Sequence, residues 1–174
     1  YESDLDLRTR ILLAPESYSV AGPVGAYRFH ALSADPDVAD ADAFSPGPGE
    51  VVVVVLSRAG DGVPDTEVLE AVEASVGGDS VRPLTDQVTV QPVQLVTFDT
   101  VAVLEVFAGP DQNLIIEQAS ASLDALYGRS RRIGRDVPRS AIIAALHVGG
   151  VERVNLLSPV ADVAIARTQV SAPG

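Results

Sequence analysis

Side chains able to perform covalent chemistry are few in this 174-residue sequence. The absence of cysteine excludes a thiolate nucleophile, a disulfide framework and a zinc site of the cysteine type. Lysine is also absent, because all twelve basic residues are arginine, so Schiff-base chemistry and a P-loop lysine are excluded. No Gly-X-Ser-X-Gly sequence provides a nucleophile elbow for serine hydrolysis. The sequence therefore predicts a protein that is not an enzyme and holds no cofactor.

Two histidines and one acidic run are the remaining candidates for metal binding. His30 and His147 lie far apart, and neither has a neighbour at the ligand spacing of an HExxH motif. The acidic run consists of Asp35, Asp37, Asp40 and Asp42. It lacks the glycine and the bidentate glutamate of an EF-hand loop in register. We predict no metal site: the aspartates form a solvated strand edge, and His147 closes a helix.

One basic cluster contrasts with the net charge of −12. Five of the twelve arginines fall within eleven residues, at Arg129, Arg131, Arg132, Arg135 and Arg139. The cluster raises the hypothesis of a docking patch for an acidic surface of a partner protein, although a solvated loop is the more common origin of such a run. The alternative is a solvated loop whose arginines form ion pairs with glutamates of the same chain.

The charge and hydropathy of the chain disfavour several other partners. A net charge of −12 repels the phosphates of nucleic acids and the surface of an anionic membrane. No apolar run approaches the roughly 20 residues that span a bilayer, and no signal peptide is visible. Because the sequence begins at Tyr1 rather than at methionine, we expect it to be a fragment of a longer protein. We predict protein partners, with no nucleic acid, membrane or small-molecule substrate.

Hydrophobic content of 47% and charged content of 21% are typical of a globular protein. The strongest element is Glu50–Ser57, whose five consecutive valines predict a central strand covered on both faces. Val38–Phe44 is predicted as the preceding strand, joined to it by a Ser-Pro-Gly-Pro-Gly turn. In that strand we expect Val38, Asp40, Asp42 and Phe44 on one face and the alanines on the other.

Three helices are predicted before residue 130. They cover Val24–Ser33, residues 65 to 76 and residues 111 to 128. Asp65 or Thr66 caps the second helix, whose buried face is predicted to hold Val68, Leu69, Val72 and Val76. The residues predicted to point to the core from the third are Leu114, Ile115, either Gln118 or Ala119, Leu123 and Leu126. Residues 1–15 are expected to form an extended arm or a helix.

A short helix and a strand are predicted after the arginine-rich loop. Pro138 suits the first turn of a helix, and Asp136 lies beside the positive end of its dipole. Ile142, Ile143 and Leu146 form its apolar stripe, and Gly149-Gly150 ends it. Strands are predicted over Gln87–Val96, Thr100–Phe107, Val151–Leu157 and Asp162–Arg167. A frayed tail, Val170–Gly174, follows them.

These elements predict an α+β fold of two small lobes. Each lobe is a short mixed or antiparallel β-sheet packed with one or two helices. Residues 1–34 form an N-terminal arm and short helix, residues 35–92 the first lobe and residues 93–174 the second. Residues 36–55 and 150–166 share the order strand, Ser-Pro turn, strand. This repeated order raises the hypothesis of an internal duplication; the alternative is two unrelated hairpins, which commonly resemble each other.

Four stretches of the sequence, taken in order, resemble the baseplate J-like family, the wedge proteins of contractile phage tails and related injection particles. They are SVAGPVGAYRFHALSADPDV (Ser19–Val38), SPGPGEVVVVVLSRAGDGVP (Ser45–Pro64), VRPLTDQVTVQPV (Val81–Val93) and GRDVPRSAIIAALHVGGVERVNLLSP (Gly134–Pro159). The resemblance implies a non-enzymatic structural protein of a tail baseplate, assembled in the bacterial cytoplasm and bound to other baseplate and wedge proteins. It also implies that this sequence is the C-terminal portion of a longer chain. The family carries no catalytic residues, and the basic RSRR sequence departs from its pattern.

A second hypothesis comes from a different class of protein. A small ligand-sensing or regulatory module of ferredoxin-like type would share this composition and this order of elements. It predicts a concave, partly apolar pocket between sheet and helices, with a few converging polar groups. The presence and polarity of such a pocket discriminate between the two hypotheses.

Overall fold

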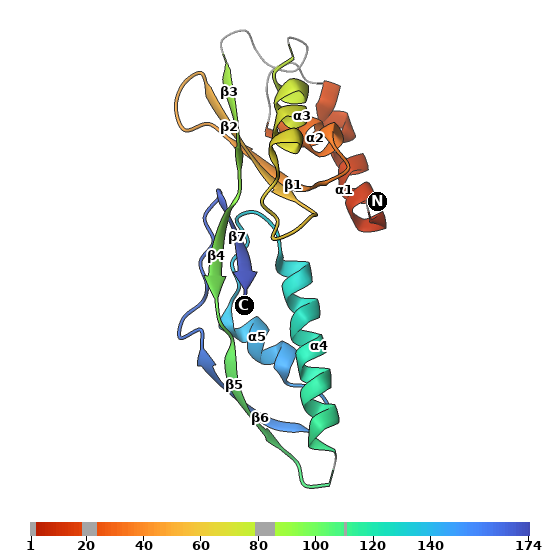
Figure 1. Ribbon diagram of the computed structural model, residues 1–174, viewed down its shortest axis with the longest axis vertical. Helices are drawn as coiled ribbons and strands as arrows, with labels where there is room; N and C mark the ends of the chain where they lie inside the picture. The colour runs from red at the N-terminus through yellow and green to blue at the C-terminus, as the bar shows by residue number, and fades with distance from the viewer. Residues whose placement is uncertain (1–2, 19–23, 79–85, 110) are drawn as a thin grey trace. The chain divides into compact units, whose positions relative to one another are not determined.

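The computed structural model describes residues 3–18, 24–78, 86–109 and 111–174 (Figure 1). Within these residues the chain forms five α-helices and three small sheets, which confirms the predicted α+β class. The chain divides into two compact units, Tyr1–Gln94 and Leu95–Gly174. Each unit has its own hydrophobic core, as the two buried clusters described below show.

Unit 1 is a three-stranded sheet with helices on one side (Figure 1). Its elements are α1 (Asp4–Leu13), the 3₁₀ turn η1 (Ala14–Tyr18), α2 (Val24–Ala34), β1 (Val38–Phe44), β2 (Glu50–Ser57), α3 (Thr66–Val76) and β3 (Gln87–Pro92). The central strand is β2, paired antiparallel with β1 and parallel with β3. The central position predicted from its five valines is therefore confirmed.

Burial along β2 explains why its sequence is apolar at successive positions. Val53, Val54 and Val55 are each 0% exposed, so side chains on both faces of the strand are removed from water. Val53 and Val55 pack with Tyr27 and Ala31 of α2 and with the buried valines of α3. Burying each such side chain contributes roughly 1.5–3 kcal/mol. This cluster is the main stabilising core of unit 1.

The predicted facing of β1 is wrong because a β-bulge interrupts the strand. Val38 pairs with Ser57 whereas Asp40 pairs with Leu56, so one residue of β1 has no counterpart on β2. Such a bulge changes which side chains share a face. Val38, Ala41 and Ala43 consequently enter the core together, with exposures of 0–1%.

Helix α3 follows its sequence pattern closely. The Asp65 side chain is the N-cap and accepts a hydrogen bond from the Val68 amide at 3.1 Å. Val68, Val72 and Val76 are buried and Leu69 packs against the same cluster, as predicted. The opposite face carries three exposed glutamates, Glu67, Glu70 and Glu73.

Unit 2 contains two two-stranded sheets and two helices. Its elements are β4 (Gln94–Phe98), β5 (Val101–Val106), α4 (Gln112–Ser130), α5 (Arg139–Leu146), β6 (Val151–Ser158) and β7 (Gln169–Pro173). The sheets pair β4 with β7 and β5 with β6, the latter antiparallel. Helices α4 and α5 lie alongside each other (Figure 1), and together with β5 and β6 they enclose the core of the unit.

Helix α4 is longer and slightly rotated relative to the prediction. It runs through Gly128 to Ser130, so Arg129 belongs to its last turn. Ile115 and Ala119 are buried as predicted, whereas Leu114 is 53% exposed and its predicted core position is wrong. One helical step of 100° separates Leu114 from Ile115, and the buried stripe follows Ile115.

The end of the chain differs most from the sequence prediction. Asp162–Arg167 is not a strand: only Val163 forms an isolated bridge, with Val137. The expected frayed tail is instead β7, in which Val170 and Ser171 are 0% exposed. Because β6 pairs with β5 and not with the residues that follow it, the second Ser-Pro turn does not join a hairpin. The hypothesis of a duplicated hairpin is therefore wrong.

The first residue of α5 is held by a carboxylate other than the predicted one. The Arg139 amide donates to Oδ1 of Asp162 at 2.8 Å. Oδ1 of Asp136 instead accepts from the amide of Ile165 at 2.7 Å. Together with the Val137–Val163 bridge, these bonds bind the segment after β6 to the start of α5.

Candidate docking surface

The predicted arginine cluster spans the end of α4, the following loop and the start of α5. Arg129 and Arg135 are exposed, whereas Arg131, Arg132 and Arg139 are half-buried. A guanidinium N–H of Arg135 donates to the carbonyl oxygen of Arg129 at 3.2 Å, and the Arg132 amide donates to that of Ser130 at 2.8 Å. The loop is thus folded back on the end of α4.

Gly134 fixes the loop to the rest of unit 2. Its φ of +69° lies in the left-handed region that favours glycine. Its amide donates to the carbonyl oxygen of Gln169, at the start of β7, at 3.0 Å. The arginines on either side of Gly134 are therefore presented from a backbone with a defined conformation.

Arg139 differs from the other members of the cluster. Its Nη2 donates to the carbonyl oxygen of Leu156 at 3.0 Å, and its Nη1 donates to that of Pro159. These bonds occupy the guanidinium within unit 2. We use the name basic surface for the other four residues, Arg129, Arg131, Arg132 and Arg135.

Charge is distributed unevenly between the two units. Residues 95–174 contain seven of the twelve arginines but only eight of the twenty-four acidic residues. Unit 2 is therefore almost neutral, and most of the net charge of −12 lies in residues 1–94. The other residues of unit 2 carry a net charge of −5, so the positive charge of the basic surface is local to these four arginines.

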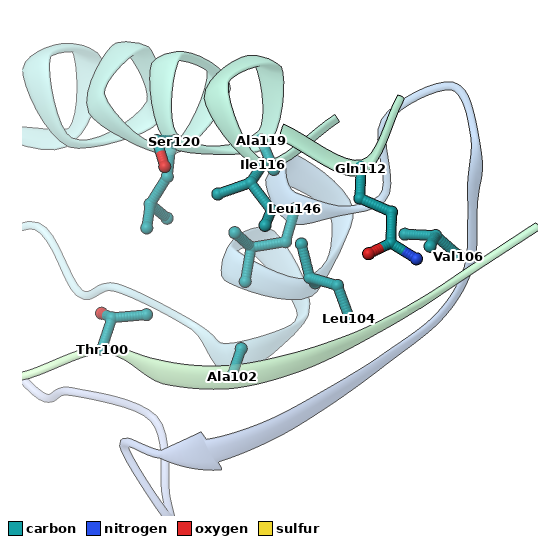
Figure 2. A pocket seen from close by; sticks show the side chains of 10 residues that line it. Thr100, Ala102, Leu104, Val106, Gln112, Ile116, Ala119, Ser120 and Leu146 are labelled. Atoms are coloured by element: carbon teal, nitrogen blue, oxygen red, sulfur yellow. The ribbon is translucent and has the colours of Figure 1, made fainter. Parts of the chain in front are cut away.

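A groove of about 410 Å³ lies in unit 2 between β5 and α4 (Figure 2). Leu104 of β5, Ile116 of α4 and Leu146 of α5 supply much of its apolar lining. Three polar side chains line it: Thr100 and Ser120 lie toward one end and Gln112 toward the other, so they do not all converge on one point (Figure 2). No charged side chain is among the residues that line it.

The polar end of the groove is already paired internally. The hydroxyl groups of Thr100 and Tyr127 form a hydrogen bond, and the Tyr127 ring packs edge-on against Phe98 at 5.7 Å between centroids. Burial raises the pKa of the Tyr127 phenol above 10.0; the hydrogen bond with Thr100 opposes this shift, and the negative charge of Asp124 adds to it. Tyr127 is thus a neutral structural residue at ordinary pH.

The other predicted site residues have structural surroundings. His147 is the C-cap of α5, as predicted, and its amide donates to the carbonyl oxygen of Ile143 at 3.0 Å. Asp35 accepts from the amide of Asp37 within a turn, and Asp40 lies 3.8 Å from the guanidinium of Arg28. Among the residues that the structure describes, no group of three or more histidine or acidic side chains could hold a metal ion. In the same residues, no helix is both long and apolar enough to cross a membrane.

The sequence analysis missed an exposed apolar face on the β5–β6 sheet. Val101, Val103, Phe107 and Leu157 are each 49–53% exposed. Glu105 shares this face and forms an ion pair with Arg153 across the strands at 3.4 Å. This exposed face could have been predicted from the alternation of β5. Glu105 is the only charged residue of that strand, and the residues that alternate with it in phase share its outward face.

Comparison with known proteins identifies related sequences and folds. Residues 19–92 match the Baseplate J-like central domain. Over 170 residues, or 98% of this chain, the sequence is 45% identical to "Baseplate protein J" of Escherichia phage P2. The match covers 56% of that protein, so the chain spans about half the length of this curated relative.

A solved structure shares the fold. The cryo-EM structure of the anti-feeding prophage (AFP) baseplate, 6-fold symmetrised, contains a chain that matches with a TM-score of 0.64 at 15% identity. The match covers 99% of this chain and 42% of that one. At this identity the similarity concerns the fold, whereas the relationship in sequence comes from the phage P2 protein and the central-domain match. Residues 19–92 therefore correspond to the Baseplate J-like central domain, and the chain is similar to Baseplate protein J over 98% of its own length.

Proposed function

We propose that this chain is a structural, non-enzymatic part of the baseplate of a contractile phage tail or tail-like particle, where it acts as a wedge subunit. The observation that carries the proposal is the 45% identity to Baseplate protein J over almost the whole chain. The sequence is consistent with a structural role, since it contains no cysteine, no lysine and neither a Gly-X-Ser-X-Gly nor an HExxH motif. In this role the chain contacts other baseplate proteins.

The basic surface is the site proposed for one of these contacts. Guanidinium groups bind carboxylates in a bidentate geometry, which provides both attraction and orientation. The exposed Arg129 lies in the last turn of α4 and the exposed Arg135 on the loop that follows, in a unit that is nearly neutral. The partner surface is therefore acidic, and the contact weakens as salt concentration rises.

Co-expression tests both parts of the proposal. The full-length parent protein is expressed with the products of its adjacent genes, purified through a tag on one of them and examined by sizing and electron microscopy. The proposal expects a stable heteromeric complex with wedge- or ring-like particles. A protein that stays alone at every salt concentration contradicts the baseplate role.

A charge-reversal variant then tests the basic surface separately. The variant carries both Arg131→Glu and Arg135→Glu. It is expected to reduce recovery of the complex at about 0.15 M salt by roughly tenfold or more, because the new glutamates repel the acidic surface of the partner. The matched control is Arg153→Glu, which reverses an exposed arginine of the same unit outside the cluster. If both variants assemble like the unmodified protein, another surface makes the contact and the baseplate role stands.

The ligand-sensing alternative rests on the groove in Figure 2. Its volume suits a small molecule, but its polar groups lie at opposite ends, and one of them is bonded to Tyr127. A screen of small apolar compounds by thermal unfolding tests this alternative. A compound that raises the midpoint temperature, combined with failure to form any complex, would favour the sensing module.

A further inference from the structure

Helix α1 contacts unit 1 in an unusual way for a surface helix. None of its residues is buried, and Leu5, Ile11 and Leu12 are 66%, 58% and 80% exposed. The Asp6 side chain, in contrast, is only 13% exposed. A surface helix of a globular protein normally turns its apolar stripe inward. In α1 a carboxylate faces the body of the unit while large apolar side chains face water.

The carboxylate of Asp6 pairs with the guanidinium of Arg58, which other hydrogen bonds already hold in place. Arg58 follows β2, and its Nε donates to the carbonyl oxygen of Pro36 at 3.0 Å while its Nη2 donates to that of Val38 at 3.1 Å. Its remaining nitrogen, Nη1, lies 2.6 Å from Oδ2 of Asp6. Arg58 therefore keeps its position without α1, and α1 adds one charge-assisted bond to a preformed site.

The helical state of α1 depends on this docking. The helix has ten residues, which is below the roughly 12–15 needed for an isolated helix to be stable in water. Ser3 caps it by accepting from the Asp6 amide at 3.2 Å, and the Ser3 hydroxyl donates to Asp6 Oδ2 at 2.9 Å. The carboxylate that reaches Arg58 therefore also joins the N-terminal cap.

We propose that α1 is a detachable arm: it is latched to unit 1 by the Asp6–Arg58 ion pair and opens while β1, β2, α2 and α3 remain folded. Local opening requires little free energy where few apolar groups are buried, whereas the β2 valines open only with the whole unit. Asp6 and Arg58 have side-chain exposures of 13% and 23%, so dissolved ions screen the attraction between the two charges only in part. This inference does not depend on the proposed baseplate role.

Amide hydrogen exchange of the purified chain tests the latch. In the unmodified protein, the α1 amides are expected to exchange at least a hundredfold faster than those of Val53–Leu56, as expected for local rather than global opening. Asp6→Asn is expected to accelerate exchange in α1 by roughly tenfold, the scale of a lost charge-assisted hydrogen bond. The β2 amides and the midpoint of thermal unfolding should not change.

The matched control is Asp4→Asn, which removes the same charge from the same helical turn at an exposed position. Asparagine at position 6 retains an oxygen that can accept from Ser3, so the cap is preserved in the test variant. Raising NaCl from about 0.1 M to about 1 M shortens the Debye length from about 10 Å to about 3 Å and should accelerate α1 exchange without any variant. The proposed latch would be contradicted if the α1 and β2 amides exchanged at equal rates, or if Asp6→Asn and Asp4→Asn accelerated α1 exchange equally.

Discussion

Nη2 of Arg139, in the first turn of α5, lies 3.0 Å from the carbonyl oxygen of Leu156, near the end of β6. The two residues belong to different elements that both contribute to the core of unit 2. A second bond from the same guanidinium, to the carbonyl of Pro159, holds the chain as it leaves the strand. One side chain thus connects the start of a helix, the end of a strand and the following turn.

Replacing Arg139 by methionine should destabilise unit 2 by about 1–3 kcal/mol, because two carbonyl oxygens lose charge-assisted hydrogen bonds while the aliphatic stem is kept. Urea unfolding measures the change. Arg135→Met is the matched control, since that arginine donates to an exposed carbonyl and its loss should cost no more than about 0.5 kcal/mol. Equal effects of the two substitutions would show that the Arg139 bonds contribute nothing to stability.

Alanine at Gly150 should destabilise unit 2 by about 1–3 kcal/mol, the cost of a side chain held at strained backbone angles. Gly150 has a φ of +95°, and a Cβ there would lie 2.7 Å from Cδ1 of the buried Ile115. The neighbouring Gly149 has open space at its Cβ position and serves as the control. In a double-mutant cycle, Ile115→Val should relieve part of the cost, and strict additivity would exclude the steric contact.

Removal of the α3 N-cap tests the helix prediction most directly. Asp65→Ala should lower the free energy of unfolding by about 0.5–2 kcal/mol, because the Val68 amide loses its acceptor. Asp65→Ser keeps a capping oxygen and should restore most of the loss. Circular dichroism during thermal unfolding measures both variants; a serine variant as unstable as the alanine variant would mean that charge, not capping, matters here.

Stability should fall at alkaline pH partly because of Tyr127. Burial raises the pKa of its phenol in the folded state, so above about pH 10 the unfolded chain releases this proton while the folded chain retains it. The stabilisation from the neutral phenol is fully present below about pH 10 and is lost as pH rises through the folded-state pKa. The absence of lysine removes the groups that usually titrate in the same range.

Urea unfolding of the unmodified protein and of Tyr127→Phe between about pH 9 and pH 11 measures this contribution. The phenylalanine variant lacks the bond to Thr100 and should be less stable at pH 9, but its stability should decline less steeply with pH. Parallel pH profiles for the two proteins would show that the phenol ionises equally in both states.

Elements with strong local signals were predictable from the sequence. The valines of β2 required a strand buried on both faces, and the Asp65 cap with its valine stripe required α3. The failures all depend on distant partners. Asp162–Arg167 alternates like a strand, yet in the described structure only Val163 pairs, in a single bridge with Val137, whereas the less regular β7 pairs with β4. A pairing partner is a tertiary property that periodicity does not encode.

The candidate site shows the same division. The arginine cluster could be identified from the sequence alone. The internal hydrogen bonds of Arg139 could not, because they depend on a turn twenty residues away. The bulge in β1 was not predictable because its position is set by pairing with β2, not by any residue within the strand. The latch residues Asp6 and Arg58 are 52 positions apart, and only the fold brings them together.

The pairing of β4 with β7 sets the order in which the chain can be completed on a ribosome. These strands pair although they are far apart in the sequence, at the start and the end of unit 2. Contacts between such distant residues raise the contact order, so we expect unit 2 to fold slowly. Unit 1, whose β1–β2 hairpin is local, can fold while unit 2 is still being synthesised. Until Gln169–Pro173 has left the exit tunnel, β4 lacks its pairing partner, and a nascent chain stalled before that point is exposed to aggregation.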